Sequence, residues 1–141
     1  MLKTQLLHPG ILRALACAGH GSQVLIADGN YPASTGSPAT AAHVYLNLAP
    51  GLVTATDVLK TIATAIPIEA AHVMATADGS IPPIFAEFAQ LLDGMELEPV
   101  ERFAFYHKAS EPSVCLVVAT GEQRIYANIL LTIGVVPPPN G

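Results

Sequence analysis

Short apolar runs, each bounded by glycine, proline or polar residues, most restrict the fold of this chain. Such runs lie within the segments Gln23–Asp28, Val114–Ala119 and Ile125–Ile133. Runs of this length, partly β-branched, predict buried strands. None approaches the ~18 to 20 consecutive apolar residues of a membrane span. The pattern therefore favours a layered globular domain and argues against a membrane protein.

Segments with helical spacing lie between these runs. Helices are expected from Pro9-Gly10 to Gly19, from Thr54-Asp57 to Pro67, and from Pro82-Pro83 to Gly94. Thr54 and Asp57 have the spacing of a capping box, and Gly19 is expected to cap the first helix with a positive φ. Weaker patterns predict strands over His43–Leu48 and Ala71–Thr76. Alternating strands and helices imply an α/β domain with a mixed or largely parallel sheet, and 141 residues suit a single domain over 1–141.

The charge content indicates an oligomer. Half of the chain, 51%, is hydrophobic and only 12% is charged, against roughly a quarter charged in an average soluble domain. A monomer with so few charges would have difficulty covering itself with polar surface. Because obligate interfaces resemble a core cut in half, the composition predicts a soluble subunit that buries surface against copies of itself.

Charge and cysteine usage exclude several other classes of function. The net charge is −5 with six Lys and Arg, so nucleic-acid binding is not expected. Cys17 and Cys115 stand far apart in apolar settings, and the N-terminus lacks the apolar core of a signal peptide. Both observations favour a reduced, cytoplasmic location. The histidines and cysteines have no metal-ligand spacing, so neither a metal nor a cofactor is expected.

Two ionisable residues flank the first predicted strand. His20 lies between Gly19 and Gly21, where it could serve as a general acid or base near neutral pH. The competing explanation is a surface histidine that favours the helix dipole. Asp28 ends the strand, at the edge of the sheet where α/β proteins bind ligands. The competing explanation for Asp28 is a loop-initiating residue that bonds its own backbone.

Polar and aromatic side chains in the second half of the chain add to these candidates. Arg102 precedes Phe103, Phe105 and Tyr106, and its planar donors could clamp vicinal hydroxyls or a ring oxygen. The alternative is an ion pair with Glu101 or Glu98. Tyr126 and Asn128 flank Ala127 at the start of a predicted strand, where both would share one face, and an ordinary strand pair is the alternative. Tyr106, Tyr31 and Phe103 are secondary candidates.

Taken together, these stretches resemble the D-ribose pyranase / L-fucose mutarotase family. The matching motifs are Gly19-His20-Gly21, Ile26-Ala27-Asp28, Thr120-Gly121-Glu122, Tyr126-Ala127-Asn128 and Gly134-Val135. Their order and approximate spacing agree over nearly the whole chain. The segment Glu101–Tyr106 is similar to the fucose branch, as is Asp28 followed by Tyr31-Pro32.

The resemblance implies a three-layer α/β/α domain with a mixed sheet, and ring-like homo-oligomers, often decamers, with sites near subunit interfaces. It implies His20 as the acid/base residue. It implies that the sugar contacts are Asp28, Arg102, Tyr126, Ala127 and Asn128. Phe103 or Tyr31 could form an apolar wall for the methyl group of a 6-deoxy sugar.

Three departures bear on the identity of the sugar. His107-Lys108 replaces the Glu-Arg that commonly follows the aromatic cluster, Ala127 matches ribose-type members, and Gly29–Pro32 differs in detail. The first expectation is a mutarotase that interconverts the anomers of L-fucose or a related aldose without a cofactor. A D-ribose pyranase, and a non-catalytic monosaccharide-binding accessory protein of sugar transport, remain alternatives.

Overall fold

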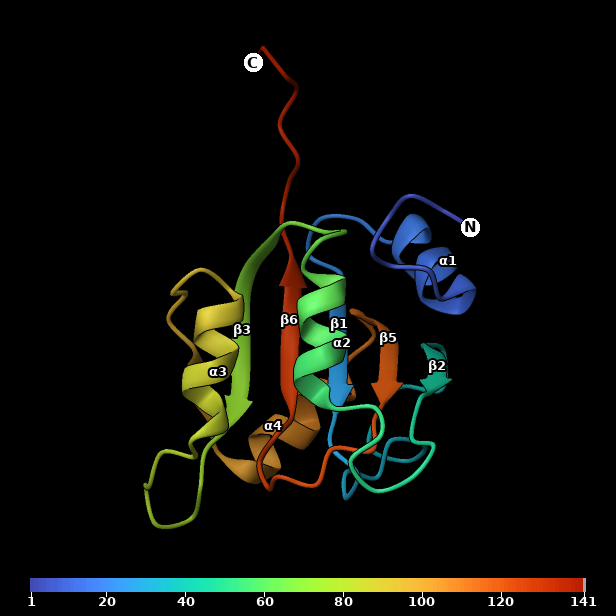
Figure 1. The fold of residues 1–141 in the computed structure, drawn as a ribbon. Helices are drawn as coiled ribbons and strands as arrows, with labels where there is room; N and C mark the ends of the chain where they lie inside the picture. Colours follow the sequence, from blue (N-terminus) through green and yellow to red (C-terminus); the bar gives the residue numbers. More distant parts are fainter. Residues whose placement is uncertain (141) are drawn as a thin grey trace.

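A computed structural model describes residues 1–140 and contains one six-stranded sheet (Figure 1). The strand order is β2-β5-β1-β6-β3-β4. β1 is parallel to β5, β5 to β2, and β3 to β4, whereas β6 is antiparallel to both of its neighbours. The sheet is therefore mixed and largely parallel, as the sequence predicted.

Strands and helices alternate along most of the chain. In order they are α1 (Pro9–Cys17), β1 (Gln23–Ala27), β2 (Ala42–Tyr45), α2 (Ala55–Ile62), β3 (Ile68–Met74), α3 (Ile84–Leu91), β4 (Glu98–Val100), α4 (Arg102–Ala109), β5 (Val114–Ala119) and β6 (Ile129–Ile133). Residues 135–140 extend away from the body (Figure 1). Among residues 1–140, no helix has the length and apolarity needed to cross a bilayer.

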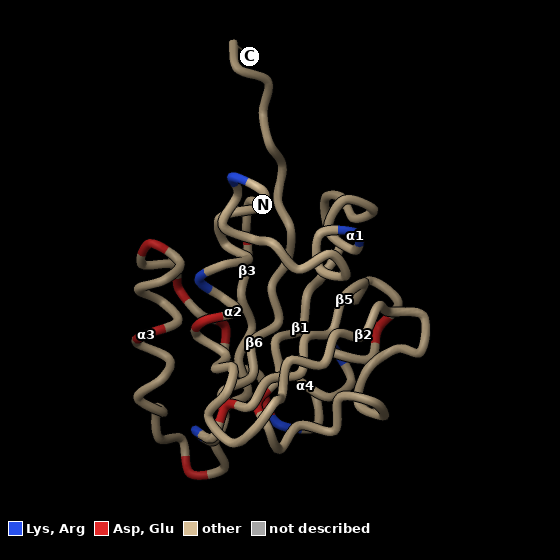
Figure 2. The backbone as a smooth tube through the Cα atoms, turned by 45° about the vertical axis from the view of Figure 1, so that its right-hand side comes forward, with Lys and Arg blue, Asp and Glu red and all other residues tan. Residues whose placement is uncertain are grey.

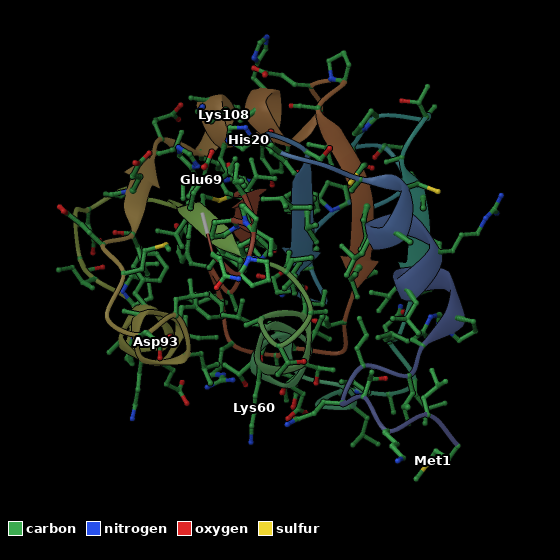
Figure 3. The ribbon with its side chains drawn as sticks, turned by 90° about the horizontal axis from the view of Figure 1, so that it is seen from above. Met1, His20, Lys60, Glu69, Asp93 and Lys108 are labelled. Carbon is green, nitrogen blue, oxygen red and sulfur yellow. The ribbon has the colours of Figure 1, made fainter. Side chains whose placement is uncertain are left out.

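Helices cover both faces of the sheet, which gives the three layers that the resemblance implied. Val24 and Ile26 of β1 pack with residues of α1, α2 and α3, whereas Leu25 and Ala27 pack with α4 and the segment 31–41. Seen from above, α2 and α3 lie on one side of the sheet and α4 on the other (Figure 3). Because β1 is buried on both faces after Gln23, its residues Val24 to Ala27 are all apolar.

Local sequence signals explain the first two helices. The capping box of α2 is present: Thr54 Oγ1 accepts from the Asp57 N–H at 3.2 Å, and the Asp57 carboxylate accepts from the Thr54 N–H at 3.3 Å. α1 begins after His8, whose Nδ1 accepts from the Gly10 N–H at 3.1 Å. The expected positive φ at Gly19 was wrong, because Ala18 ends the helix in an extended conformation and Gly21 has the positive φ of 84°.

The structure contains a helix, α4, that the sequence pattern did not reveal. Glu101 caps it by accepting from the N–H groups of Phe103 and Ala104 at 3.0 and 3.1 Å. Only Phe105 and Ala109 are buried, so the segment has little amphipathic periodicity from which a helix could be recognised. α4 places Arg102 and Tyr106 one turn apart on the same side.

Several predicted boundaries move. β6 begins at Ile129 rather than Ile125, so Tyr126, Ala127 and Asn128 lie in the preceding turn. Tyr126 has a φ of 59°, a left-handed conformation that a regular strand does not contain. The prediction that Tyr126 and Asn128 alternate along a strand was therefore wrong. The helix expected to reach Pro67 ends at Ile62, and β3 begins at Ile68.

Charged residues are sparse and scattered over the fold (Figure 2). No stripe of Lys or Arg follows any helix in the view of Figure 2. This distribution agrees with the low charged fraction of 12%.

Candidate functional site

A cavity of about 260 Å³ opens at the edge of the sheet where the parallel strands end. It is lined by Asp28, Asn30, Tyr31, Met74, Arg102, Tyr106, Ile125, Tyr126 and Asn128. Asp28 directly follows β1, and Met74 is the last residue of β3. The cavity thus lies beyond the carboxyl ends of strands, where open α/β sheets bind their ligands.

Four of the predicted sugar contacts meet in this cavity: Asp28, Arg102, Tyr126 and Asn128. The secondary candidates Tyr31 and Tyr106 line it as well. Ala127 does not: it is fully buried and packs in the core on the α2 side. The roles of these residues remain predictions, but their proximity is a property of the fold.

Asp28 is buried and carries several hydrogen bonds. Its Oδ1 accepts from the backbone N–H groups of Asn30 and Tyr31 at 3.0 and 2.9 Å. The loop-initiating interpretation is therefore correct, and the residue also lines the cavity. Burial raises the pKa of Asp28 above its ordinary value of 3.8, although the hydrogen bonds to its carboxylate oppose the shift.

Asn128 is fixed by the backbone N–H and the carboxylate of Asp28. Its Oδ1 accepts from the Asp28 N–H at 2.7 Å, and its Nδ2 donates to Asp28 Oδ2 at 3.2 Å. Both groups of the amide are thereby oriented, and the turn before β6 is tied to the end of β1. A rigid amide and carboxylate side by side suit the hydroxyl groups of a polyol.

Arg102 lies at the start of α4 among aromatic rings. Its guanidinium carbon is 5.8 Å from the centroid of Tyr106 and 5.9 Å from that of Phe103, within the range of cation–π contacts. The predicted alternative, an ion pair with Glu101 or Glu98, was wrong within the described chain. Glu101 caps α4, and Glu98 pairs with His72 at 2.6 Å. The guanidinium donors therefore remain available to a ligand.

Aromatic residues form one wall of the cavity. The rings of Tyr31 and Tyr106 are tilted with centroids 5.3 Å apart. The Tyr31 hydroxyl donates to the Gly36 carbonyl at 2.7 Å, and burial raises its pKa, so Tyr31 contributes an apolar ring rather than an acidic group. Phe103, the other wall candidate, is 73% exposed and lies outside the cavity.

His20 lies at the opposite end of the sheet from this cavity. It precedes β1, whereas Asp28 follows it, and the five-residue strand between them spans about 16 Å at ~3.3 Å per residue. The His20 side chain is 58% exposed, and its Nε2 is 3.1 Å from both carboxylate oxygens of Glu69 (Figure 3). Within one chain, Glu69 rather than Asp28 therefore orients His20.

Sequence reasoning missed three lining residues: Asn30, Met74 and Ile125. Asn30 carries a signal in retrospect, because it lies two residues after Asp28 in the same turn. Met74 and Ile125 are apolar and look like ordinary core or surface residues in the sequence. A larger cavity of about 660 Å³ adjoins the first and shares Ile125 and Tyr126 with it. Within residues 1–140, no group of three or more His, Cys, Asp or Glu side chains could hold a metal ion.

The chain is similar to known proteins over nearly its whole length. The family model described as the RbsD / FucU transport protein family matches residues 1–136. A fucose mutarotase of Danio rerio is 35% identical over 94% of this chain and 91% of its own length. A D-ribose pyranase of Variovorax paradoxus (strain S110) is 32% identical over 96% and 98%.

A solved structure extends the comparison to three dimensions. The fucose mutarotase of Streptococcus pneumoniae, crystallised in complex with L-fucose, superimposes with a TM-score of 0.83 at 26% identity, over 97% of this chain and 100% of that one. The sequence match and the shared architecture lead to the same conclusion: the chain belongs to the RbsD / FucU transport protein family.

Proposed function

We propose that this protein is a sugar mutarotase that interconverts the α and β anomers of a monosaccharide, with L-fucose as the preferred substrate. The convergence of Asp28, Arg102, Tyr126 and Asn128 on one cavity carries the proposal. Its volume, about 260 Å³, suits a monosaccharide, because drug-sized ligands typically occupy ~300 to 1,000 Å³. The 35% identity to a fucose mutarotase supports the choice of sugar.

The reaction requires two coupled proton transfers. A base accepts the proton of the anomeric hydroxyl while the bond between C1 and the ring oxygen breaks. The electron pair of that bond goes to the ring oxygen, which an acid protonates. After rotation about the C1–C2 bond, the hydroxyl formed from the ring oxygen attacks the other face of the aldehyde. It gives up its proton as the new bond forms, and the aldehyde oxygen takes up a proton to become the anomeric hydroxyl again. Positioned proton transfer of this kind typically contributes about 10² to 10⁴-fold.

The residues of the cavity would hold the sugar through this sequence. Asp28 can accept hydrogen bonds from hydroxyl groups, and Arg102 can donate to them through its planar fork. Tyr126 and Asn128 would contact the opposite side of the ring. Met74 and Ile125 offer apolar surface that suits the methyl group of a 6-deoxy sugar.

We propose that His20 acts as the acid/base group in the cavity of a neighbouring subunit. Within its own chain, His20 is exposed and separated from the cavity by β1. A closed oligomer can bring the amino end of one sheet to the carboxyl end of the next, because heterologous contacts join different surfaces. The low charged fraction supports large contacts between copies. The proposed assembly is a decamer, as the family resemblance implied, and its proposed location is the cytoplasm, as cysteine usage favoured.

Anomeric exchange measured by saturation-difference NMR tests the activity. We expect wild-type protein to accelerate exchange of L-fucose more than exchange between the pyranose and furanose forms of D-ribose. No acceleration above the spontaneous rate for either sugar would contradict a mutarotase. Light scattering tests the assembly, since a stable monomer would be incompatible with a shared site.

A D-ribose pyranase is the second candidate, because a relative with that name is 32% identical and Ala127 matches the ribose type. Preferential acceleration of D-ribose in the same experiment would favour it. A non-catalytic binding protein would give unchanged exchange in wild type and in His20→Ala, while still binding the sugar.

A further inference from the structure

The loop that delivers Tyr126 and Asn128 begins with Thr120-Gly121-Glu122, a motif that the proposed reaction leaves without a role. Glu122 is 3% exposed, although it is a carboxylate and lies outside the sugar cavity. Glutamate is rarely so buried unless its oxygens are paired. Its contacts therefore indicate what the motif does.

The Glu122 carboxylate joins the loop to a helix. Its Oε2 accepts from the backbone N–H of Ala55, the first residue of α2, at 3.1 Å. Oε1 accepts from the backbone N–H of Arg124 at 3.0 Å and from Arg124 Nε at 2.9 Å, while Oε2 accepts from Nη2 at 2.9 Å. The arginine fork thus meets the carboxylate in a bidentate pair, the strongest geometry for such contacts.

Arg124 extends this connection to two further side chains. Its Nη1 donates to the Glu87 carboxylate on α3, and its Nη2 donates to Thr56 Oγ1 at 3.2 Å. The hydrogen bonds from Arg124 hold the pKa of Glu122 below its usual range, so the carboxylate is ionised at neutral pH. The charged pair therefore fastens residues 122–124 to α2 and α3, immediately before the left-handed Tyr126.

The backbone of Glu122 connects to the other half of the sugar cavity. The Glu122 carbonyl accepts from the Gly29 N–H at 2.9 Å, next to Asp28. Gly121 fits tightly beside it: a Cβ there would lie 2.3 Å from the Leu52 carbonyl oxygen. Glu122 thus contacts both the turn that follows Asp28 and, through Arg124, the loop that leads to Asn128.

We propose that Glu122 is a positioning residue of the sugar site, which holds Tyr126 and Asn128 in place through Arg124 and the N-terminus of α2. The inference rests on the proposed function, because it assigns those two residues to sugar binding. The Glu122 side chain is not among the residues that line the sugar cavity. Its effect is transmitted through the loop, and a helix-capping role alone would not reach the cavity.

Glu122→Gln tests the proposal with a side chain of nearly the same shape. The amide loses the negative charge and cannot accept all four hydrogen bonds from Ala55 and Arg124. We expect the dissociation constant for L-fucose, measured by calorimetry, to rise by about tenfold, as loss of one charge-assisted hydrogen bond would produce. The KM should rise with it, while kcat changes by less than about threefold.

Hydrogen exchange of the free protein provides a readout that needs no sugar. In Glu122→Gln, amides of residues 123–128 and 29–31 should exchange faster than in wild type, because both segments lose a common anchor. Thr54→Ala is the matched control: it removes the capping box at the same end of α2 but leaves Glu122 intact. We expect it to lower stability without changing the dissociation constant for L-fucose.

Equal effects of Glu122→Gln and Thr54→Ala on sugar affinity would overturn the proposal, as would unchanged hydrogen exchange in both segments. If Glu122→Gln fails to fold, Arg124→Gln breaks the same ion pair by changing its more exposed partner. This variant should also raise the dissociation constant for L-fucose. Failure of the proposed function is a separate result, since it would appear as absence of anomeric exchange in the wild-type protein.

Discussion

Asp28 and Asn128 hold each other at the edge of the sheet through two hydrogen bonds, one from the Asp28 N–H and one to its carboxylate. The two residues are far apart in sequence and join the end of β1 to the turn before β6. This pair makes the floor of the cavity rigid before any ligand arrives. Pre-organisation of this kind lowers the entropy that binding would otherwise cost.

Asn128→Asp should remove the hydrogen bond that the amide donates to Asp28, while a carboxylate oxygen could still accept from the Asp28 N–H. A second carboxylate would face Asp28 in a buried position, and the donor to Asp28 Oδ2 would be lost. We expect the free energy of unfolding to fall by about 2 kcal/mol and L-fucose affinity to fall by at least ~10-fold. Urea unfolding and calorimetric titration measure the two effects. Wild-type affinity in this variant would show that the pair does not shape the site.

Arg102→Lys should impair the reaction without affecting the fold. Lysine keeps the charge but loses the planar fork that suits two adjacent hydroxyl groups. We expect kcat/KM to fall by at least ~10-fold, while stability changes by less than about 0.5 kcal/mol because Arg102 is exposed. Arg13→Lys, on exposed α1 surface, is the control and should leave anomeric exchange unchanged. Equal rates of anomeric exchange in the two variants would show that Arg102 does not act in the sugar site.

The sequence predicted the layers of the fold because β1 and β5, buried on both faces, read as continuous apolar runs. It did not predict α4, whose exposed side chains hide the helical period. The polar cavity residues were recognisable because ionisable residues are scarce in this chain, with 12% charged, and several of them lie where loops meet apolar strands. Met74 offered no such signal, and the φ of Tyr126 is imposed by tertiary contacts rather than by local preference.

The position of His20 was the least accessible to sequence reasoning. His20 and Asp28 are close in the sequence. The extended strand β1 lies between them, however, and therefore places them at opposite ends of the sheet. The ion pair with Glu69 on β3 depends on how β3 and β1 flank β6, which is a property of the assembled sheet.

Stability should depend on pH through Asp28. Because its folded pKa is raised above 3.8, the folded protein retains a proton that the unfolded chain has already released. The stabilisation from Asp28 is therefore complete below about pH 3.8 and is lost as pH rises through the folded pKa. Urea unfolding from about pH 3 to 7 measures the free energy of unfolding of wild type and of Asp28→Asn. The value for wild type minus the value for the variant should decline as the pH rises. A difference that grows with pH would contradict the assignment.

Glu69→Gln should slow the reaction by freeing the His20 ring. The amide keeps the size of the side chain but removes the carboxylate that orients Nε2. We expect kcat for anomeric exchange to fall severalfold, with KM and stability nearly unchanged because both residues are exposed. Glu111→Gln is a matched control, since Glu111 forms a comparable exposed pair with His107 at 3.8 Å. Equal kcat values in the two variants would argue against a role for Glu69.

Mixed oligomers test most directly whether one copy's His20 works in another copy's cavity. His20→Ala and Asp28→Asn should each be nearly inactive alone. Co-assembled in equal amounts, they should recover roughly a quarter of wild-type exchange, because that share of sites receives both intact partners from different chains. Asp28→Asn mixed with Asn128→Asp, two changes in one cavity, should be no more active than the average of the two variants measured alone. Activity of the first mixture no higher than that of the single variants would contradict a site shared between subunits.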